Sequence, residues 1–293
     1  MKKMLLALCT MMVPASLLAL PLGNPWEASL HKSGICWSND CCDEWNVCPS
    51  FWDSFGYRIG YYGDYVFDRH MKVARNHSRI HKTKISTNAA YFAFNYCNRL
   101  DLFGTLGASH IELSTPFSSL GGPTVGAVNN AFVNVDTETS FSWSLGLRGT
   151  LLQWGCLGIG GEAQYFRVNP RLNSTSLAQF DTFYFPNEER PHYHEWQLGL
   201  GAAYRINISD SSSALIPYMG VKWSQCRFRA DNVRSLLVVA AATPGVTIFT
   251  LEHDRSWGYA VGMTLLGCNK ASVTVEGRFI NEKALYVNGQ FRF

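Results

Sequence analysis

Apolar and polar side chains alternate residue by residue over long stretches of this chain. In "SFGYRIGYYGDYVFDR", Phe55, Tyr57 and Ile59 fall on one side of an extended strand. Arg58 and Asp64 fall on the other side. The same alternation recurs in "TSFSWSLGLRGTLL", "YHEWQLGLGAAYRIN", "WGYAVGMTLL", "ASVTVEGRFI" and the closing "EKALYVNGQFRF". A period of two residues is typical of strands that are apolar on one face, so the pattern predicts an all-β fold.

The length and composition of these strands favour a transmembrane antiparallel β-barrel. Several run past eight residues, whereas soluble strands usually have ~5–6 and tilted membrane strands ~9–11. Charged residues are 16% of the chain, against ~25% in an average soluble domain. After the first residues, no run reaches the ~18 apolar residues of a membrane helix. A soluble β-sandwich also alternates, but its wet face would carry more Lys and Glu than the Ser, Gly, Thr and Gln present here.

The connections between the predicted strands alternate in length. Residues 153–156, 209–213 and 267–270 are short turns, and residues 169–192 and 229–254 are long. Outer-membrane barrels have short periplasmic turns and longer external loops. Ten strands are clear, near 55–67, 88–97, 101–113, 139–152, 157–168, 193–207, 214–228, 255–266, 271–280 and 284–293. Several more fit in 26–38, 117–135, 174–186 and 232–251, so the chain accommodates 12 to 16 strands.

The start of the chain predicts export. Lys2 and Lys3 precede an apolar run from Met4 to Leu18, and Ala19 is a small residue at a cleavage position. This is the pattern of a secretory signal peptide. We expect a signal peptide over residues 1–19, a cysteine-rich N-terminal segment over 20–53 and a barrel over 54–293.

Four cysteines gather in "CWSNDCCDEWNVC": Cys36, Cys41, Cys42 and Cys48. An exported chain meets an oxidising compartment, where disulfides form. The spacing does not match the paired C-x-x-C pattern of a zinc site, so disulfides are the favoured interpretation. Whether the bonds join residues of one chain or of two chains is left open by the sequence.

Charged residues on the polar faces are candidate pore-lining groups. They are Arg58, Asp64, Arg148, Glu162, Glu195, Arg205, Lys222, Glu276, Arg278 and Arg292. They could form a constriction whose electric field tunes ion selectivity. They could equally form salt bridges that stiffen the wall, and both interpretations stay open.

The chain carries no recognisable catalytic or cofactor motif. "RPHYHEW" brings His192, His194 and Glu195 close in sequence, but adjacent strand residues point to opposite faces, so no metal site is expected. "GIGGE" (158–162) lacks the following helix that phosphate binding needs, and its glycines suit a crowded interior. The basic run over residues 69–84 suits either lipopolysaccharide binding or a solvated loop. We therefore expect neither enzyme activity nor a cofactor, and the net charge of +3 gives no sign of a nucleic-acid partner.

Several blocks together resemble the major outer membrane porin family of chlamydiae: "LPLGNP", "GYYGDYVFDR", "NRLDLFGTLGAS", "FSWSLGLRG", "YHEWQLGLGAAYRIN", "PYMGVKWS" and "VNGQFRF". The resemblance implies a 16-stranded barrel, often a homotrimer, that passes small solutes through the outer membrane. It also implies disulfide cross-links to other envelope proteins, and the cysteine cluster lies where the family carries one. The chain is shorter than expected of the principal porin, with the losses falling in 114–138, 169–192 and 229–254. A paralogue with a reduced surface is the interpretation that follows.

The predicted function is diffusion of small hydrophilic solutes and ions across the outer membrane, in contact with its lipid and lipopolysaccharide. The alternatives are a disulfide-linked structural envelope protein and a surface adhesin. The last strand should place Leu285, Val287, Phe291 and Phe293 toward lipid. The resemblance further implies that the terminal Phe293 is an assembly signal.

Overall fold

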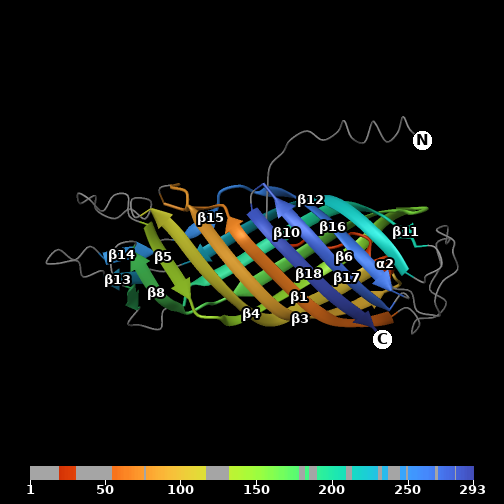
Figure 1. Cartoon of the computed structure of the whole chain (residues 1–293), viewed down its shortest axis with the longest axis horizontal. Helices are drawn as coiled ribbons and strands as arrows, with labels where there is room; N and C mark the ends of the chain where they lie inside the picture. Colours follow the sequence, from red (N-terminus) through yellow and green to blue (C-terminus); the bar gives the residue numbers. More distant parts are fainter. Residues whose placement is uncertain are drawn as a thin grey trace, which may run out of the picture.

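Ten long strands form a closed antiparallel ring (Figure 1). The computed structural model describes residues 20–30, 55–75, 77–116, 132–177, 182–184, 190–208, 213–229, 233–236, 245–248, 250–267, 270–280 and 282–293. The ring strands are β1 (Phe55–Arg69), β3 (Lys82–Tyr96), β4 (Leu100–Pro116), β6 (Ser140–Trp154), β7 (Leu157–Val168), β10 (His192–Tyr204), β12 (Ser213–Arg229), β16 (Trp257–Gly267), β17 (Ala271–Phe279) and β18 (Glu282–Arg292). Their order is β3-β1-β18-β17-β16-β12-β10-β7-β6-β4, and pairing of β3 with β4 closes the ring. Closure leaves no unpaired edge toward lipid.

The other strands are short and lie off the ring. They are β2 (Met71–Val73), β5 (Phe132–Thr137), β8 (Leu172–Leu177), β9 (Thr182–Tyr184), β11 (Ile206–Asn207) and β15 (Leu251–His253), with a separate hairpin of β13 (Val233–Leu236) and β14 (Gly245–Ile248). The prediction of an antiparallel barrel is confirmed, and the sheet contains sixteen strands. Only ten of them form the wall, because the six short strands have two to six residues and a membrane crossing needs ~9–11.

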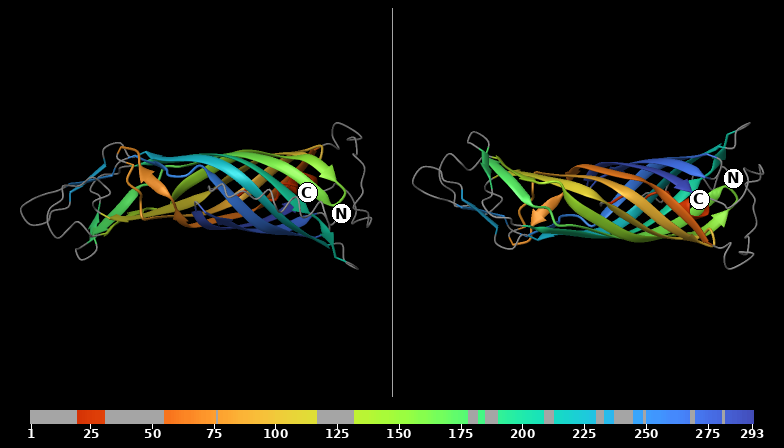
Figure 2. Two further views of the ribbon diagram at one scale, coloured as in Figure 1. Left: turned by 90° about the horizontal axis from the view of Figure 1, so that it is seen from above. Right: turned by 90° about the horizontal axis from the view of Figure 1, so that it is seen from below.

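The two ends of the barrel differ. At one end, named here the short-turn end, the ring strands are joined by 97–99, 155–156, 205–212 and 268–270. At the other, the long-connection end, the connections are 70–81, 117–139, 169–191 and 230–256, with 280–281 as the one short exception among them. The strands β5, β8, β13 and β14 project from the long-connection end (Figures 1 and 2). The predicted asymmetry of short turns and long loops is present.

The outer face of the wall is apolar. Its exposed side chains include Tyr57, Ile59, Tyr61, Phe92, Leu102, Leu106, Leu145, Leu147, Leu198, Leu200, Val261, Met263, Leu265, Val273 and Val275. Exposed aromatic residues flank this belt, with Tyr96, Trp154 and Tyr204 at the short-turn end. Phe67, Phe141, Trp257 and Phe279 stand toward the long-connection end. An apolar band between two aromatic girdles is the surface that lipid requires. Among the described residues, no helix has the length and apolar character to cross a membrane.

The closing strand follows the predicted alternation. Leu285 and Phe291 are exposed on the outer face, and Phe293 is 77% exposed. The backbone N–H of Phe293 donates to the carbonyl oxygen of Tyr57 at 3.1 Å, which extends the ladder between β18 and β1 to the last residue. Phe293 also packs edge-on against Phe291. These contacts place the terminal aromatic ring at the short-turn rim of the lipid-facing wall.

Candidate functional site: an occluded barrel lumen

The lumen holds the charged side chains that the wall turns inward. Nine of the ten predicted pore-lining residues point there and are at most 6% exposed. They are Arg58, Asp64, Arg148, Glu162, Glu195, Lys222, Glu276, Arg278 and Arg292. Arg205 differs, because it lies between β10 and β11 at the short-turn end and donates to Asn207 Oδ1 at 3.0 Å. Arg69, Asp101 and Glu282 also face the lumen and were not among the predicted residues.

One group of buried charges centres on Glu282 at the start of β18. Arg278 Nε lies 3.1 Å from a Glu282 carboxylate oxygen, and Lys222 Nζ and Arg69 Nη1 each lie 3.8 Å from one. Arg278 also pairs with Asp64 on β1. Because a charge taken out of water is costly unless it is paired, these residues stabilise the lumen only as a group.

A second group centres on Glu195 of β10. Its carboxylate accepts hydrogen bonds from Arg69 Nη1 at 2.7 Å, from Tyr193 Oη at 2.6 Å and from Ser224 Oγ at 2.9 Å. Glu195 is thus held inward while its neighbour His194 lies on the outer face. The sequence-based expectation that "RPHYHEW" divides its ligand-type side chains between two faces agrees with this geometry.

Residues 20–30, called here the plug segment, run inside the ring and end in the short helix α2 (Glu27–Leu30). The backbone N–H groups of Leu22 and Gly23 donate to the two carboxylate oxygens of Glu276, at 3.0 and 2.9 Å. Tyr218 Oη donates to the same carboxylate at 2.9 Å. The carboxylate on the wall therefore satisfies two consecutive backbone groups that have no ladder partner.

Glu27 joins the plug segment to the wall by an ion pair. Its carboxylate pairs with Arg148 on β6 and accepts a hydrogen bond from Gln290 on β18. Arg148 Nε also lies 2.6 Å from Glu162 on β7, so the guanidinium lies between one carboxylate of the plug segment and one of the wall. A charge-assisted contact of this kind is stronger than a neutral hydrogen bond.

The wall is shaped to receive the plug segment. A Cβ atom at Gly158 would lie 2.5 Å from ring carbons of Trp26, and one at Gly199 would lie 2.2 Å from Leu22 Cδ1. At Gly160 the added atom would lie 1.7 Å from a carbonyl oxygen of the plug segment. Glycine at these wall positions therefore allows the plug segment to approach the backbone of β7 and β10.

The plug segment also contacts the wall near the short-turn end. Ser29 Oγ donates to Thr150 Oγ1 at 2.9 Å, and Asn95 Nδ2 donates to the carbonyl oxygen of Ala28 at 2.8 Å. Apolar side chains complete this contact: Trp26, Leu30, Ala203, Ala214, Ile216, Tyr218 and Leu266 form one buried cluster. Contacts of both kinds therefore hold α2 inside the ring.

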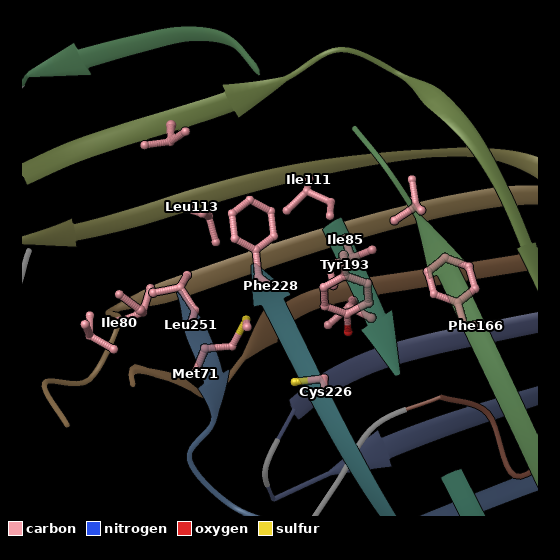
Figure 3. Packing of buried hydrophobic residues seen from close by; sticks show 14 of the residues in the cluster. Met71, Ile80, Ile85, Ile111, Leu113, Phe166, Tyr193, Cys226, Phe228 and Leu251 are labelled. Atoms are coloured by element: carbon pink, nitrogen blue, oxygen red, sulfur yellow. The ribbon is translucent and has the colours of Figure 1, made fainter. Parts of the chain in front are cut away.

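An apolar cluster, called here the apolar seal, fills the lumen toward the long-connection end (Figure 3). Wall residues contribute Val66, Ile85, Ile111, Leu113, Phe166, Val168, Tyr193, Cys226, Phe228 and Ala284. Residues off the ring contribute Leu20, Met71, Val73, Ile80, Val133, Val135, Leu172 and Leu251. Within the described residues, the lumen is thus closed in two layers, and Leu20 connects them.

The predicted disulfide cysteines Cys36, Cys41, Cys42 and Cys48 lie outside the described residues, so their pairing stays a prediction. Cys156, in the turn between β6 and β7, is disulfide-bonded. Cys226 keeps a reduced thiol buried in the apolar seal.

A closed antiparallel ring with an apolar belt outside and polar side chains inside defines an outer-membrane β-barrel protein. The family model described as Chlamydia major outer membrane protein matches residues 1–79, 74–186, 186–250 and 242–293. The chain belongs to this family and is a protein of the outer membrane.

Two similar relatives are both called major outer membrane porin. The chain is 32% identical to the one from Chlamydia pneumoniae over 376 aligned positions, which cover 95% of each chain. It is 30% identical to the serovar A protein of Chlamydia trachomatis, over 100% of each chain. Among solved structures, the outer membrane protease OmpT from Escherichia coli is similar over 85% of this chain and 100% of its own, with 11% identity and a TM-score of 0.44.

Proposed function

We propose that the protein is a gated porin, which passes small hydrophilic solutes and ions after the plug segment and the apolar seal move. Transport of this kind needs no catalytic group. The observation that carries the proposal is that the ring closes by strand pairing alone, from β3 through β18 to β4. The plug segment belongs to none of these strands, so it can leave without opening the wall.

The wall behind the plug segment supports a passage for water. Its inward side chains include Thr105, Ser144, Gln164, Gln197, Thr264, Thr274 and Asn288 beside the charged groups. Such a surface would be hydrated once the plug segment had left. The charged side chains of the lumen would then tune which ions pass. The name porin that the relatives carry agrees with this function.

The apolar seal is compatible with opening because short strands supply part of it. β15 pairs with β12 through two residue pairs, and with β2 through three. Each contact is small compared with the ladder between two wall strands, which extends over up to fifteen residue pairs. Movement of β2 and β15 would therefore break few hydrogen bonds and leave the ring intact.

A second candidate function is that of a structural envelope protein with a permanently closed lumen. The specific observation in its favour is the burial of both layers, since Leu22, Trp26, Met71 and Leu251 are at most 2% exposed. Disulfide links through the cysteine-rich segment would then provide the envelope with rigidity.

Single-channel recording in a planar bilayer separates the two functions. A gated porin gives discrete openings separated by long closed times, and variants that loosen the plug segment open more often. A structural protein gives no steps in either case. Swelling of sugar-loaded liposomes with the same preparations tests whether uncharged solutes also pass.

A further inference from the structure

Three ligand-type side chains meet on the outer surface near the long-connection end, away from the lumen. His110 and Glu112 are alternate residues of β4, and Asp136 on β5 is the direct cross-strand partner of Glu112. Their neighbours along the strands point inward into the apolar seal: Ile111 lies between His110 and Glu112, and Val135 precedes Asp136. Alternation therefore places His110, Glu112 and Asp136 together on the outer face.

This place lies beyond the lipid-facing belt. The outer face of β4 begins with Leu100, Leu102 and Leu106, which are exposed apolar residues. It then changes to His110 and Glu112, which are partly exposed. The three ligand-type side chains are therefore open to water.

The atoms that could bind a metal converge. His110 Nε2 lies 3.1 Å from Asp136 Oδ1 and 3.6 Å from Glu112 Oε1. One ligand atom from each residue lies within 4.8 Å of the others. Metal–ligand bonds of ~2.0–2.2 Å to a central ion require separations of this size, after small side-chain adjustments.

The second oxygen of each carboxylate is held by a residue outside this group. Lys84 on β3 pairs with Glu112 Oε2, and Asn173 Nδ2 on β8 donates to Asp136 Oδ2 at 3.1 Å. Both contacts leave the other oxygen, Oε1 or Oδ1, directed at the imidazole. Outer hydrogen bonds that orient carboxylate ligands are a regular part of metal sites.

We propose that His110, Glu112 and Asp136 bind a divalent transition metal of the zinc class. One imidazole and two carboxylates form a ligand set that zinc accepts, and hard ions such as magnesium prefer oxygen alone. Three protein ligands leave at least one coordination position open. A cavity of about 430 Å³ lies beside Glu112 and Asp136 and leaves room for a water or another small ligand.

The lysines set an upper limit on the affinity. Lys82 and Lys84 line the same cavity, and their positive charges oppose a cation there. Without a metal, the same residues would form a surface cluster of polar side chains with Lys84 and Asn173 as outer partners. The two interpretations differ in one measurable property, which is zinc affinity assigned to these three side chains.

Zinc titration against a chromophoric chelator tests the proposal, with the full chain folded in detergent. We expect His110→Ala and the nearly isosteric Asp136→Asn to lose one bound zinc per chain, or to bind it at least tenfold more weakly. His192→Ala is the matched control, because His192 is an exposed histidine held by Asn169 Oδ1 at 3.0 Å. It should bind zinc as the wild-type chain does.

The cysteines and other histidines provide background sites, so only differences between variants count. Equal stoichiometry and affinity for His110→Ala, Asp136→Asn and His192→Ala would overturn the proposal. So would equal binding of magnesium and zinc at the site. Channel recordings do not bear on this result, so the metal site and the porin function stand or fall separately.

Discussion

Replacement of Glu27 by alanine should open the lumen. In the closed structure Glu27 is buried and supplies the carboxylate that pairs with Arg148 and accepts from Gln290. The change removes no residue of the wall. It leaves Arg148 with Glu162 as its remaining carboxylate partner, at 2.6 Å. The closed state therefore loses a paired charge, while an open lumen hydrates Arg148 in either protein.

The size of the effect follows from the burial of this pair. Removal of one partner of a buried ion pair costs ~3–5 kcal/mol. The lower end applies because Glu162 still compensates part of the charge of Arg148, so we expect about 3 kcal/mol. Since ~1.4 kcal/mol is a factor of ten in an equilibrium constant, the ratio of open to closed protein should rise about 100-fold.

Single-channel recording of purified protein measures this ratio as open probability. The matched control is Glu138→Ala, which removes a carboxylate from the exposed pair with Arg171, 3.8 Å apart and outside the lumen. An exposed ion pair contributes ~0–1 kcal/mol to stability, so this variant should have the open probability of the wild type. The reasoning is refuted if Glu27→Ala folds normally and its open probability stays within threefold of the control.

Three further changes address other parts of the structure. Gly158→Val should raise open probability, because the valine side chain would overlap Trp26. Gly289→Val is the control and should leave open probability unchanged, since an added Cβ there meets nothing within 4 Å. Equal open probabilities of the two variants would count against the contact between Gly158 and the plug segment. Glu282→Ala should lower the free energy of unfolding in urea by ~3–5 kcal/mol, since it leaves the cations around it short of a partner; an unchanged midpoint would mean that the group is not stabilising. Phe293→Asp should change unfolding by only ~0–1 kcal/mol at the lipid rim, yet reduce the heat-modifiable protein found in the outer membrane; normal membrane levels would disprove the assembly signal.

Much of the wall could be predicted from the sequence, because the alternation indicates whether each side chain faces lipid or the lumen. Tyr57 and Ile59 are exposed to lipid and Arg58 is buried in the lumen, as the period of two requires. The pattern failed where the period breaks. A bulge between Thr150 and Leu152 turns Leu151 and Leu152 both outward, and a local insertion of this kind leaves no clear mark in a periodic pattern.

The alternation of apolar and polar residues could not predict the size of the ring or the contents of the lumen. The short strand β5 alternates as the wall strands do. The pattern therefore could not show which predicted strands form the wall and which extend beyond it. The plug segment shows no alternation, and its contacts lie far along the chain. Leu22 donates to Glu276 and Glu27 accepts from Gln290, 254 and 263 positions away. Arg69 and Glu282 lie at strand ends, where alternation gives the least guidance. The glycines of "GIGGE" did indicate a crowded interior, although not what crowds it.

The most direct test of the account is a disulfide that locks the plug segment to the wall. A Cβ atom at Gly199 would lie 3.7 Å from Leu22 Cγ. The sulfur of Leu22→Cys would take the place of this Cγ, so small shifts suffice to form a disulfide in the double variant Leu22→Cys/Gly199→Cys. Conductance is recorded before and after reductant, with each single variant treated identically to account for the native cysteines. If residues 20–30 close the lumen, the oxidised double variant shows no openings and they return on reduction. Openings of equal frequency in the locked and reduced protein would contradict the claim that residues 20–30 close the lumen.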